Sequence, residues 1–191
     1  MRVITAPEKV VLNDGEISVF LAGGITDCYN WQQDIINYIK SKNFAEKENL
    51  VLLNPRRENF PIHDPSASME QITWEFNALE NADIFSMYFV NSKSVQPICM
   101  YELGRNIVKM QMRKPIDWKD RIIISVEDGY KREQDVQIQV ELACGEYIPV
   151  NTGFGAERTM WYHGDYIVRS YHNILRRWKD FYGYKSYKKY I

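Results

Sequence analysis

The segment from Ala82 to Val90, Ala-Asp-Ile-Phe-Ser-Met-Tyr-Phe-Val (ADIFSMYFV), decides the fold of this chain. It is a nearly continuous apolar run, which is typical of a strand buried on both faces of a parallel sheet. Similar short apolar runs predict four further strands, at residues 17–22, 50–53, 121–126 and 147–150. In chain order, the segment that decides the fold is strand three of five.

Helical patterns separate these strands. Apolar residues share a face over residues 29–40, and a capping box beginning at Ser68 predicts a helix over 69–81. Pro97 suits the first turn of the next helix, and a weaker helical pattern covers 133–144. The alternation predicts an α/β fold: a flavodoxin-like (Rossmann-like) three-layer sandwich with a five-stranded parallel sheet. We expect the winding order 2-1-3-4-5, which places a ligand crevice at the carboxyl ends of strands one and three.

The chain is divided in this interpretation into a domain of residues 1–150 and a helical extension of residues 151–191. Apolar and aromatic residues of the extension recur at helical spacing and predict a long amphipathic helix: Trp161, Val168, Tyr171, Leu175, Trp178 and Tyr182. Its basic residues, which include Lys185, Lys188 and Lys189, leave a nucleic-acid or nucleotide contact open. Packing of the aromatic stripe on the domain or on a sister subunit is the favoured interpretation.

The composition is that of an ordinary soluble globular protein. The chain has 191 residues, of which 45% are hydrophobic, and a formal net charge of −1, so bulk charge does not favour nucleic acid. Cys28, Cys99 and Cys144 are widely spaced, and the three histidines show no ligand spacing. We therefore expect no disulfide, no metal and no cofactor, with a cytoplasmic location and no membrane partner.

Two glutamates are the candidate catalytic residues. Glu102 lies near the start of the helix that follows strand three, close to the rim of the expected crevice. Glu75 lies on the preceding helix, whose start meets the same edge of the sheet. Paired carboxylates are what cleavage of a glycosidic bond requires. A packing alternative stays open for both, because carboxylates are common in first helical turns and on solvated helix faces.

Glycine and arginine residues after the first two strands are candidate ligand contacts. Gly23 and Gly24 permit close approach of a ligand to the backbone, although glycines end many strands. Arg56 and Arg57 could bind a phosphate or a sugar, or could be surface charge.

Six sequence blocks occur in a characteristic order: SVFLAGGI (18–25), NW (30–31), NPRR (54–57), QITWE (71–75), NADIF (81–85) and YELGR (101–105). Together they resemble the nucleoside 2-deoxyribosyltransferase-like family. The resemblance implies that the glutamate of the ELG block, Glu102, attacks C1′ of the sugar, and that Glu75 assists substrate orientation and proton handling. The expected substrate-binding residues are Gly23, Gly24, Ile25, Arg56, Arg57, Trp74, Asp83, Gln96 and Tyr101.

The resemblance implies a flavodoxin-like enzyme that cleaves the N-glycosidic bond of a (deoxy)nucleoside or nucleotide and transfers the sugar to another base. The alternatives are hydrolysis, as in the related deoxynucleoside monophosphate N-glycosidases, and a non-catalytic nucleotide sensor. Gln96 departs from the acidic residue that typical transferases carry six positions before the nucleophile, which leaves base preference and turnover open. The expected partners are a nucleoside or nucleotide, a free nucleobase and, by resemblance, further copies of the chain in a homo-oligomer.

Overall fold

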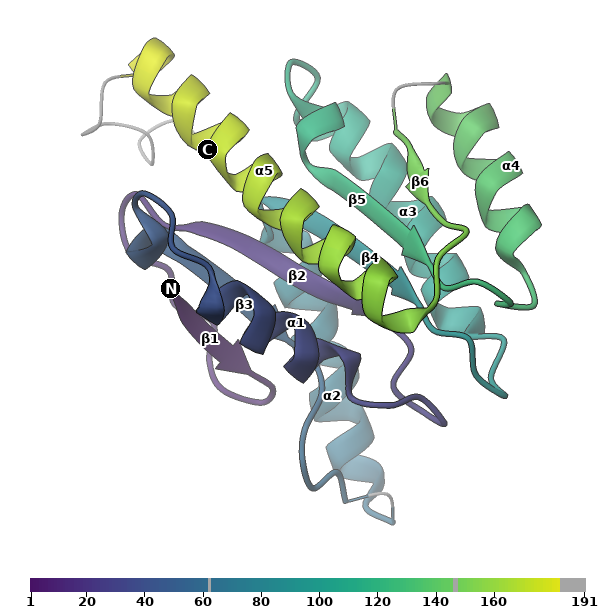
Figure 1. Ribbon diagram of the computed structural model, residues 1–191. Helices are drawn as coiled ribbons and strands as arrows, with labels where there is room; N and C mark the ends of the chain where they lie inside the picture. The colour runs from purple at the N-terminus through teal and green to yellow at the C-terminus, as the bar shows by residue number, and fades with distance from the viewer. Residues whose placement is uncertain (62, 146–147, 183–191) are drawn as a thin grey trace.

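The computed structural model describes residues 1–61, 63–145 and 148–182. These residues form a single parallel sheet of six strands in the order β1-β3-β2-β4-β5-β6 (Figure 1). The strands are β1 (Arg2–Thr5), β2 (Ile17–Gly23), β3 (Leu50–Asn54), β4 (Ile84–Phe89), β5 (Ile122–Val126) and β6 (Val150–Asn151).

The order of the five predicted strands is confirmed, because β2 to β6 follow the winding order 2-1-3-4-5. The winding reverses between β2 and β4, which pair in parallel from Val19 with Ile84 to Gly23 with Tyr88. The strand count is corrected from five to six: β1 adds an edge strand, paired with β3 from Arg2 with Val51 to Thr5 with Asn54.

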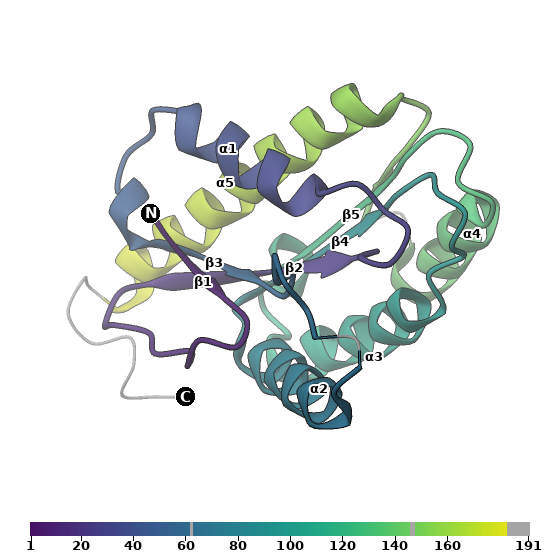
Figure 2. The same ribbon diagram turned by 90° about the horizontal axis from the view of Figure 1, so that it is seen from below.

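Helices cover both faces of the sheet, as Figure 2 shows. One layer contains α1 (Trp31–Ser41) and α5 (Ala156–Tyr182). The other contains α2 (Pro65–Asn81), α3 (Pro97–Arg113) and α4 (Glu133–Cys144). Short 3-10 helices, η1 (Lys47–Asn49) and η2 (Trp118–Asp120), precede β3 and β5. Each helical layer buries its own apolar cluster against the sheet, so the three-layer sandwich is confirmed.

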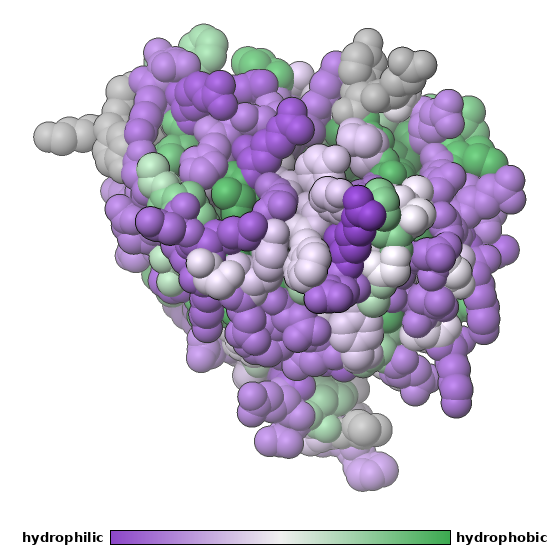
Figure 3. Space-filling model, in the orientation of Figure 1, coloured by the Kyte–Doolittle hydropathy of each residue, from purple (hydrophilic) through white to green (hydrophobic). Residues whose placement is uncertain are grey.

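The long amphipathic helix predicted near the C-terminus is α5. Its residues Ile167, Tyr171 and Ile174 are fully buried in the cluster shared with α1 and the sheet. The outer surface over α1 and α5 is mostly hydrophilic (Figure 3). Tyr171, Leu175 and Trp178 of the predicted stripe therefore pack on the domain itself, whereas Trp161 is exposed. Helix α5 completes one of the two helical layers. The Tyr182 side chain and the basic residues Lys185, Lys188 and Lys189 lie outside the part of the chain that is described.

Two predicted boundaries differ from the structure by more than two residues. Helix α2 begins at Pro65 instead of after Ser68, because the Asp64 carboxylate accepts the Ser66 N–H at 2.9 Å and caps the helix. The last strand is Val150–Asn151 instead of 147–150, and Tyr147 lies outside the described residues. Among those residues, no helix is long and apolar enough to cross a membrane.

Candidate active site

A pocket of about 190 Å³ opens at the carboxyl ends of β2 and β4, where the winding of the sheet reverses. This is the edge at which a doubly wound sheet binds its ligand. The pocket is lined by residues of β2, the segments after β2, β3 and β4, and helices α2 and α3: Phe20, Ala22, Gly23, Gly24, Ile25, Thr26, Pro55, Glu75, Ser94, Gln96, Pro97, Ile98, Cys99 and Glu102.

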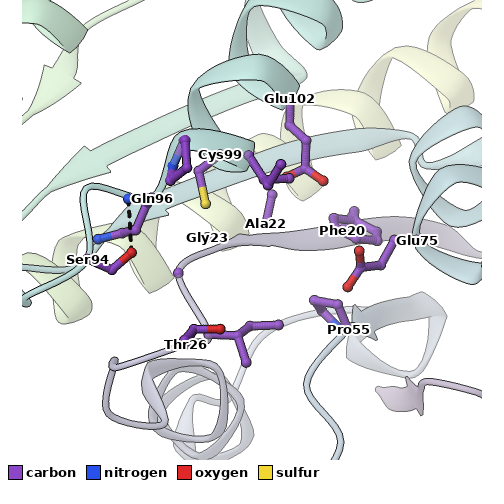
Figure 4. A pocket seen from close by; sticks show the side chains of 14 residues that line it. Phe20, Ala22, Gly23, Thr26, Pro55, Glu75, Ser94, Gln96, Cys99 and Glu102 are labelled. Carbon is purple, nitrogen blue, oxygen red and sulfur yellow. Dashed lines mark hydrogen bonds between the residues drawn. The ribbon is translucent and has the colours of Figure 1, made fainter. Parts of the chain in front are cut away.

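Glu75 and Glu102 reach this pocket from two different helices. Glu102 projects from the second turn of α3, and Glu75 projects from the neighbouring helix α2 (Figure 4). Both carboxylates point into the cavity, with Phe20 of β2 between them at its floor. The structure thus brings together the two carboxylates that the sequence paired.

Burial changes the protonation of both carboxylates. Burial and, secondly, the charge of Glu75 raise the pKa of Glu102 to about 7, while Arg105 opposes the rise. Burial also raises the pKa of Glu75, against the effects of Gln71 and Arg57. Two carboxylates that interact in this way titrate as a pair, so the pocket takes up a proton more readily than two exposed carboxylates would.

The orientation of Glu75 is fixed by a residue of its own helix. The Gln71 side-chain amide donates to Glu75 Oε1 at 2.7 Å and to the Pro55 carbonyl at 2.7 Å. Gln71 therefore links the catalytic candidate on α2 to the segment after β3. Its position one turn before Glu75 is the sequence signal from which this contact could have been anticipated.

The two glycines at the carboxyl end of β2 are required by close packing. A β-carbon on Gly23, whose φ is +155°, would lie 2.3 Å from the Tyr88 carbonyl oxygen. A β-carbon on Gly24 would lie 2.6 Å from both Cys28 Sγ and Gln96 Oε1. The backbone at Gly23 and Gly24 forms one wall of the pocket, and these contacts fix its position.

Gln96 immediately precedes α3 and holds the segment that leads into the helix. Its φ and ψ of 48° and 56° are left-handed, which is strained for a residue with a β-carbon. Its side-chain amide donates to the Val90 carbonyl at 2.7 Å and accepts from the Val90 N–H at 3.3 Å. Ser94 Oγ accepts the Gln96 N–H at 3.1 Å. The amide that replaces the acid of typical transferases thus fixes the β4–α3 connection at the pocket rim.

A comparison with known protein families identifies the family of this chain. Residues 16–116, just over half of the chain, match the family described as nucleoside 2-deoxyribosyltransferase like. The chain belongs to the nucleoside 2-deoxyribosyltransferase-like family. A search among curated proteins gave no match. Membership supports an enzyme that acts by glycosyl transfer or N-glycosidic bond cleavage on nucleosides and nucleobases.

The segment that matches the nucleoside 2-deoxyribosyltransferase-like family contains every residue that lines the pocket. It ends before β5, so α4, α5 and the last two strands lie outside the match. Those elements extend the sheet and its covering layers. The residues that line the pocket all come from the family segment.

The two arginines of the NPRR block contact protein groups. The Arg56 guanidinium donates to the backbone carbonyls of Ile25, Cys28 and Tyr29 at 3.3, 2.7 and 2.6 Å. Arg57 donates to Glu70 on α2 at 2.5 Å. Neither arginine lines the pocket. Arg56 instead holds the segment after β2, and Ile25 and Thr26 of that segment line the pocket.

Three more of the expected substrate-binding residues lie outside the pocket. Trp74 is buried, and its indole N–H donates to the Glu8 carbonyl at 2.6 Å. Tyr101 is 68% exposed on α3, away from the lining. Asp83 precedes β4 at the opposite edge of the sheet, where its carboxylate accepts the Ser18 N–H and hydroxyl, both at 2.9 Å.

Several lining residues were absent from the sequence prediction: Phe20, Ala22, Thr26, Pro55, Ser94, Pro97, Ile98 and Cys99. Phe20 and Ala22 could have been found from strand alternation, since they share one face of β2 near its carboxyl end. Thr26, Pro55 and Ser94 lie in connecting segments whose course the sequence does not define. Pro97, Ile98 and Cys99 belong to the first turn of α3. Among the described residues, no group of three or more His, Cys, Asp and Glu side chains could hold a metal ion.

Proposed function

We propose that this protein cleaves the N-glycosidic bond of a nucleoside with Glu102 as the nucleophile and transfers the sugar to a second base. The observation that carries the proposal is the pair of partly buried carboxylates, Glu75 and Glu102, that reach one pocket from the neighbouring helices α2 and α3. Family membership supports the same class of reaction.

In the first step, the ionised Glu102 carboxylate attacks C1′ of the sugar. A bond forms between Glu102 oxygen and C1′, the C1′–N bond breaks, and its electron pair leaves with the base, which takes up a proton. In this proposal Glu75, whose pKa is raised by burial, supplies that proton to the base. This division of labour between two carboxyl groups is that of a retaining glycosidase.

In the second step, a nitrogen of the incoming base attacks C1′ and loses its proton. The ester bond breaks and the Glu102 carboxylate is restored. Glu75 accepts the proton, which returns the pair to its starting state. Water in place of the second base would give free sugar, so hydrolysis is the alternative outcome of the same mechanism.

The pocket favours a substrate without a phosphate. No lysine or arginine is among the described residues that line it, while Glu75 and Glu102 place negative charge there. A 5′-phosphate would meet no compensating cation, since Arg56 and Arg57 are engaged elsewhere. We therefore propose a nucleoside as the substrate in preference to its 5′-monophosphate.

Product analysis tests this function. Each of several nucleosides and their 5′-monophosphates is incubated with the protein, with and without a second free base, and the products are separated by chromatography. Transfer gives a new nucleoside only when the acceptor is present. Free sugar in the presence of excess acceptor would replace transfer by hydrolysis. Binding of nucleosides without any product would indicate a non-catalytic sensor.

Trapping identifies the nucleophile. A 2-fluoro-substituted sugar slows formation and breakdown of the ester, so that an adduct accumulates when the leaving base is a good one. Intact mass followed by peptide mapping is expected to place the adduct on the peptide containing Glu102, and Glu102→Gln should abolish it. An adduct on another side chain would refute the assigned role.

We also propose that copies of the chain associate through the outer faces of α2 and α3. Exposed apolar residues form a stripe at helical spacing on each helix: Met69, Ile72 and Phe76 on α2, and Ile98, Tyr101, Val108 and Met112 on α3. Light scattering is expected to give a multiple of the chain mass, reduced by Ile72→Glu. A monomeric wild-type protein at micromolar concentration would exclude this assembly.

A further inference from the structure

Helices α2 and α3 carry the two carboxylates of the pocket, and a set of long charged side chains joins these helices. Three cations of α3, spaced four residues apart, reach one carboxylate of α2. Arg105 donates to Glu80 Oε1, Lys109 Nζ lies 4.0 Å from the same oxygen, and Arg113 lies 2.8 Å from Glu80 Oε2. We call Glu80, Arg105, Lys109 and Arg113 the α2–α3 seam.

Arg105 is the member of the seam nearest to the pocket. It lies three residues after Glu102 on α3, so the two side chains share one face of the helix. Its guanidinium carbon also lies 4.5 Å from the centre of the Phe76 ring. Phe76 directly follows Glu75 on α2. One side chain thus connects the helical turn of Glu102 with that of Glu75.

The contacts of Arg105 with Glu80 and Phe76 fix the orientation of its guanidinium group. A planar guanidinium that both pairs with a carboxylate and stacks on a ring is restricted in orientation, unlike a lysine ammonium. Its side chain is 23% exposed and that of Glu80 is 21% exposed, so the pair is partly shielded from water. Such a pair resists displacement of α2 relative to α3 more than an exposed ion pair would.

We propose that Arg105 is a positioning residue for the reaction: its contacts with Glu80 and Phe76 hold α2 against α3 and thereby set the separation of Glu75 and Glu102 across the pocket. The catalytic role of Arg105 rests on the proposed function. Its structural part, the coupling of the two carboxylates through Arg105 and its contacts with Glu80 and Phe76, can be measured without turnover.

The charged groups around the two carboxylates also affect their pKa values, so the variants must separate a change of charge from a change of position. Glu102 faces Glu75 from α2 and Arg105 from its own helix, beside the thiol of Cys99. Glu75 faces Arg57 as well as Glu102. Removing Arg105 would change both charge and position, so the first variant should leave its charge in place. Glu80→Gln does so, because it weakens the partner of Arg105 on α2.

The experiment is a double-mutant cycle on carboxyl titrations followed by ¹³C NMR. The change in the pKa of Glu102 caused by Glu75→Gln measures the coupling of the pair. We expect this change to fall by half or more when Glu80→Gln or Arg105→Lys is also present, because the carboxylates are then less closely held. Arg113→Gln is the matched control: it contacts the same Glu80 two turns further from the pocket, and it should leave the coupling unchanged.

Kinetics give the second readout. In Glu80→Gln and Arg105→Lys, kcat is expected to fall about 10- to 100-fold, as for a small misplacement of catalytic groups, while Arg113→Gln keeps the wild-type value. Thermal melts identify variants that do not fold. Unchanged coupling in folded Arg105→Lys and Glu80→Gln would overturn the proposal, as would equal effects in Arg113→Gln. Absence of turnover in the wild type would refute the proposed function alone, because the titration cycle still decides whether Arg105 holds the pair.

Discussion

Gly24 and Gln96 meet so closely that a β-carbon on the glycine would lie 2.6 Å from the amide oxygen of the glutamine. This contact joins the turn after β2 to the residue before α3, and both segments line the pocket. The glycine turn therefore has a packing requirement whether or not a ligand approaches it.

Gly24→Ala is expected to lower the free energy of unfolding by about 1–3 kcal/mol, the usual cost of overpacking. Since the new methyl group must displace Gln96 or Cys28, kcat/KM should fall with it. Gly104→Ala is the matched control, because a β-carbon there meets no atom within 4 Å. An alanine in that helix should stabilise the protein by about 0.5–1 kcal/mol. Urea unfolding measures both, and a wild-type stability for Gly24→Ala would contradict the contact.

Gln96→Glu tests whether a carboxyl group at this position would raise the rate of the reaction. An ionised glutamate cannot donate to the Val90 carbonyl, which now accepts the amide N–H at 2.7 Å. We expect a loss of about 1–3 kcal/mol in the free energy of unfolding at pH 8, because a buried acceptor is left without its donor. We expect no gain in kcat. A variant that is equally stable and faster than the wild type would show that Gln96 is replaceable by the acid.

Glu75→Gln should move the acidic limb of the pH profile of kcat/KM to lower pH. The negative charge of Glu75 helps to raise the pKa of Glu102 to about 7, so its removal lets the nucleophile ionise at lower pH. The maximal rate should nevertheless fall by about 100-fold or more, because a proton-transfer group is lost. Rates between pH 4 and pH 9 measure both effects, and a limb that stays at the wild-type position would contradict the coupling.

Asp83→Ala separates a structural role from a substrate contact. Asp83 accepts two hydrogen bonds from Ser18, and Arg121 donates to the Asp83 carbonyl at 3.0 Å at the edge opposite the pocket. Losing the carboxylate should cost about 2–4 kcal/mol of stability, since it leaves buried donors unpaired. Because Asp83 lies at the edge of the sheet opposite the pocket, the kcat/KM of the folded variant should stay within about twofold of the wild-type value. A selective loss of activity without loss of stability would restore Asp83 to the site.

The sequence predicts the strand order because β2 to β5 are continuous apolar runs, whereas β1 is missed because only Ile4 of its four residues is buried. Glu75 lies ten residues after the start of α2, and the family resemblance marks it. Glu102 is found because a helix that follows a parallel strand starts at the carboxyl edge of the sheet. By the same rule Asp83, which comes before its strand, belongs at the other edge. Arg56 could not be placed, since its partners are backbone carbonyls of a segment whose conformation no pattern encodes.

His163 connects α5 to the sheet through a buried hydrogen-bonded network. Its Nε2 lies 2.6 Å from Ser86 Oγ of β4 and its Nδ1 lies 2.8 Å from Ser125 Oγ of β5. Full burial lowers its pKa to about 3, so the folded protein holds the neutral imidazole. The contribution of His163 to stability is therefore complete above the unfolded pKa of about 6.5, and it is lost as the pH falls toward 3.

His163→Asn is expected to remove this dependence on pH. Between about pH 6.5 and pH 3, the unfolded wild-type chain binds a proton that the folded chain does not, which reduces stability by about 1.4 kcal/mol per pH unit. The variant should be less stable at pH 7, because Ser86 and Ser125 lose a partner, and its stability should fall less steeply in acid. Urea unfolding at pH 4, 5, 6 and 7 gives the two slopes. Parallel slopes would show that His163 binds a proton equally in the folded and unfolded chains, contrary to its burial between the sheet and α5.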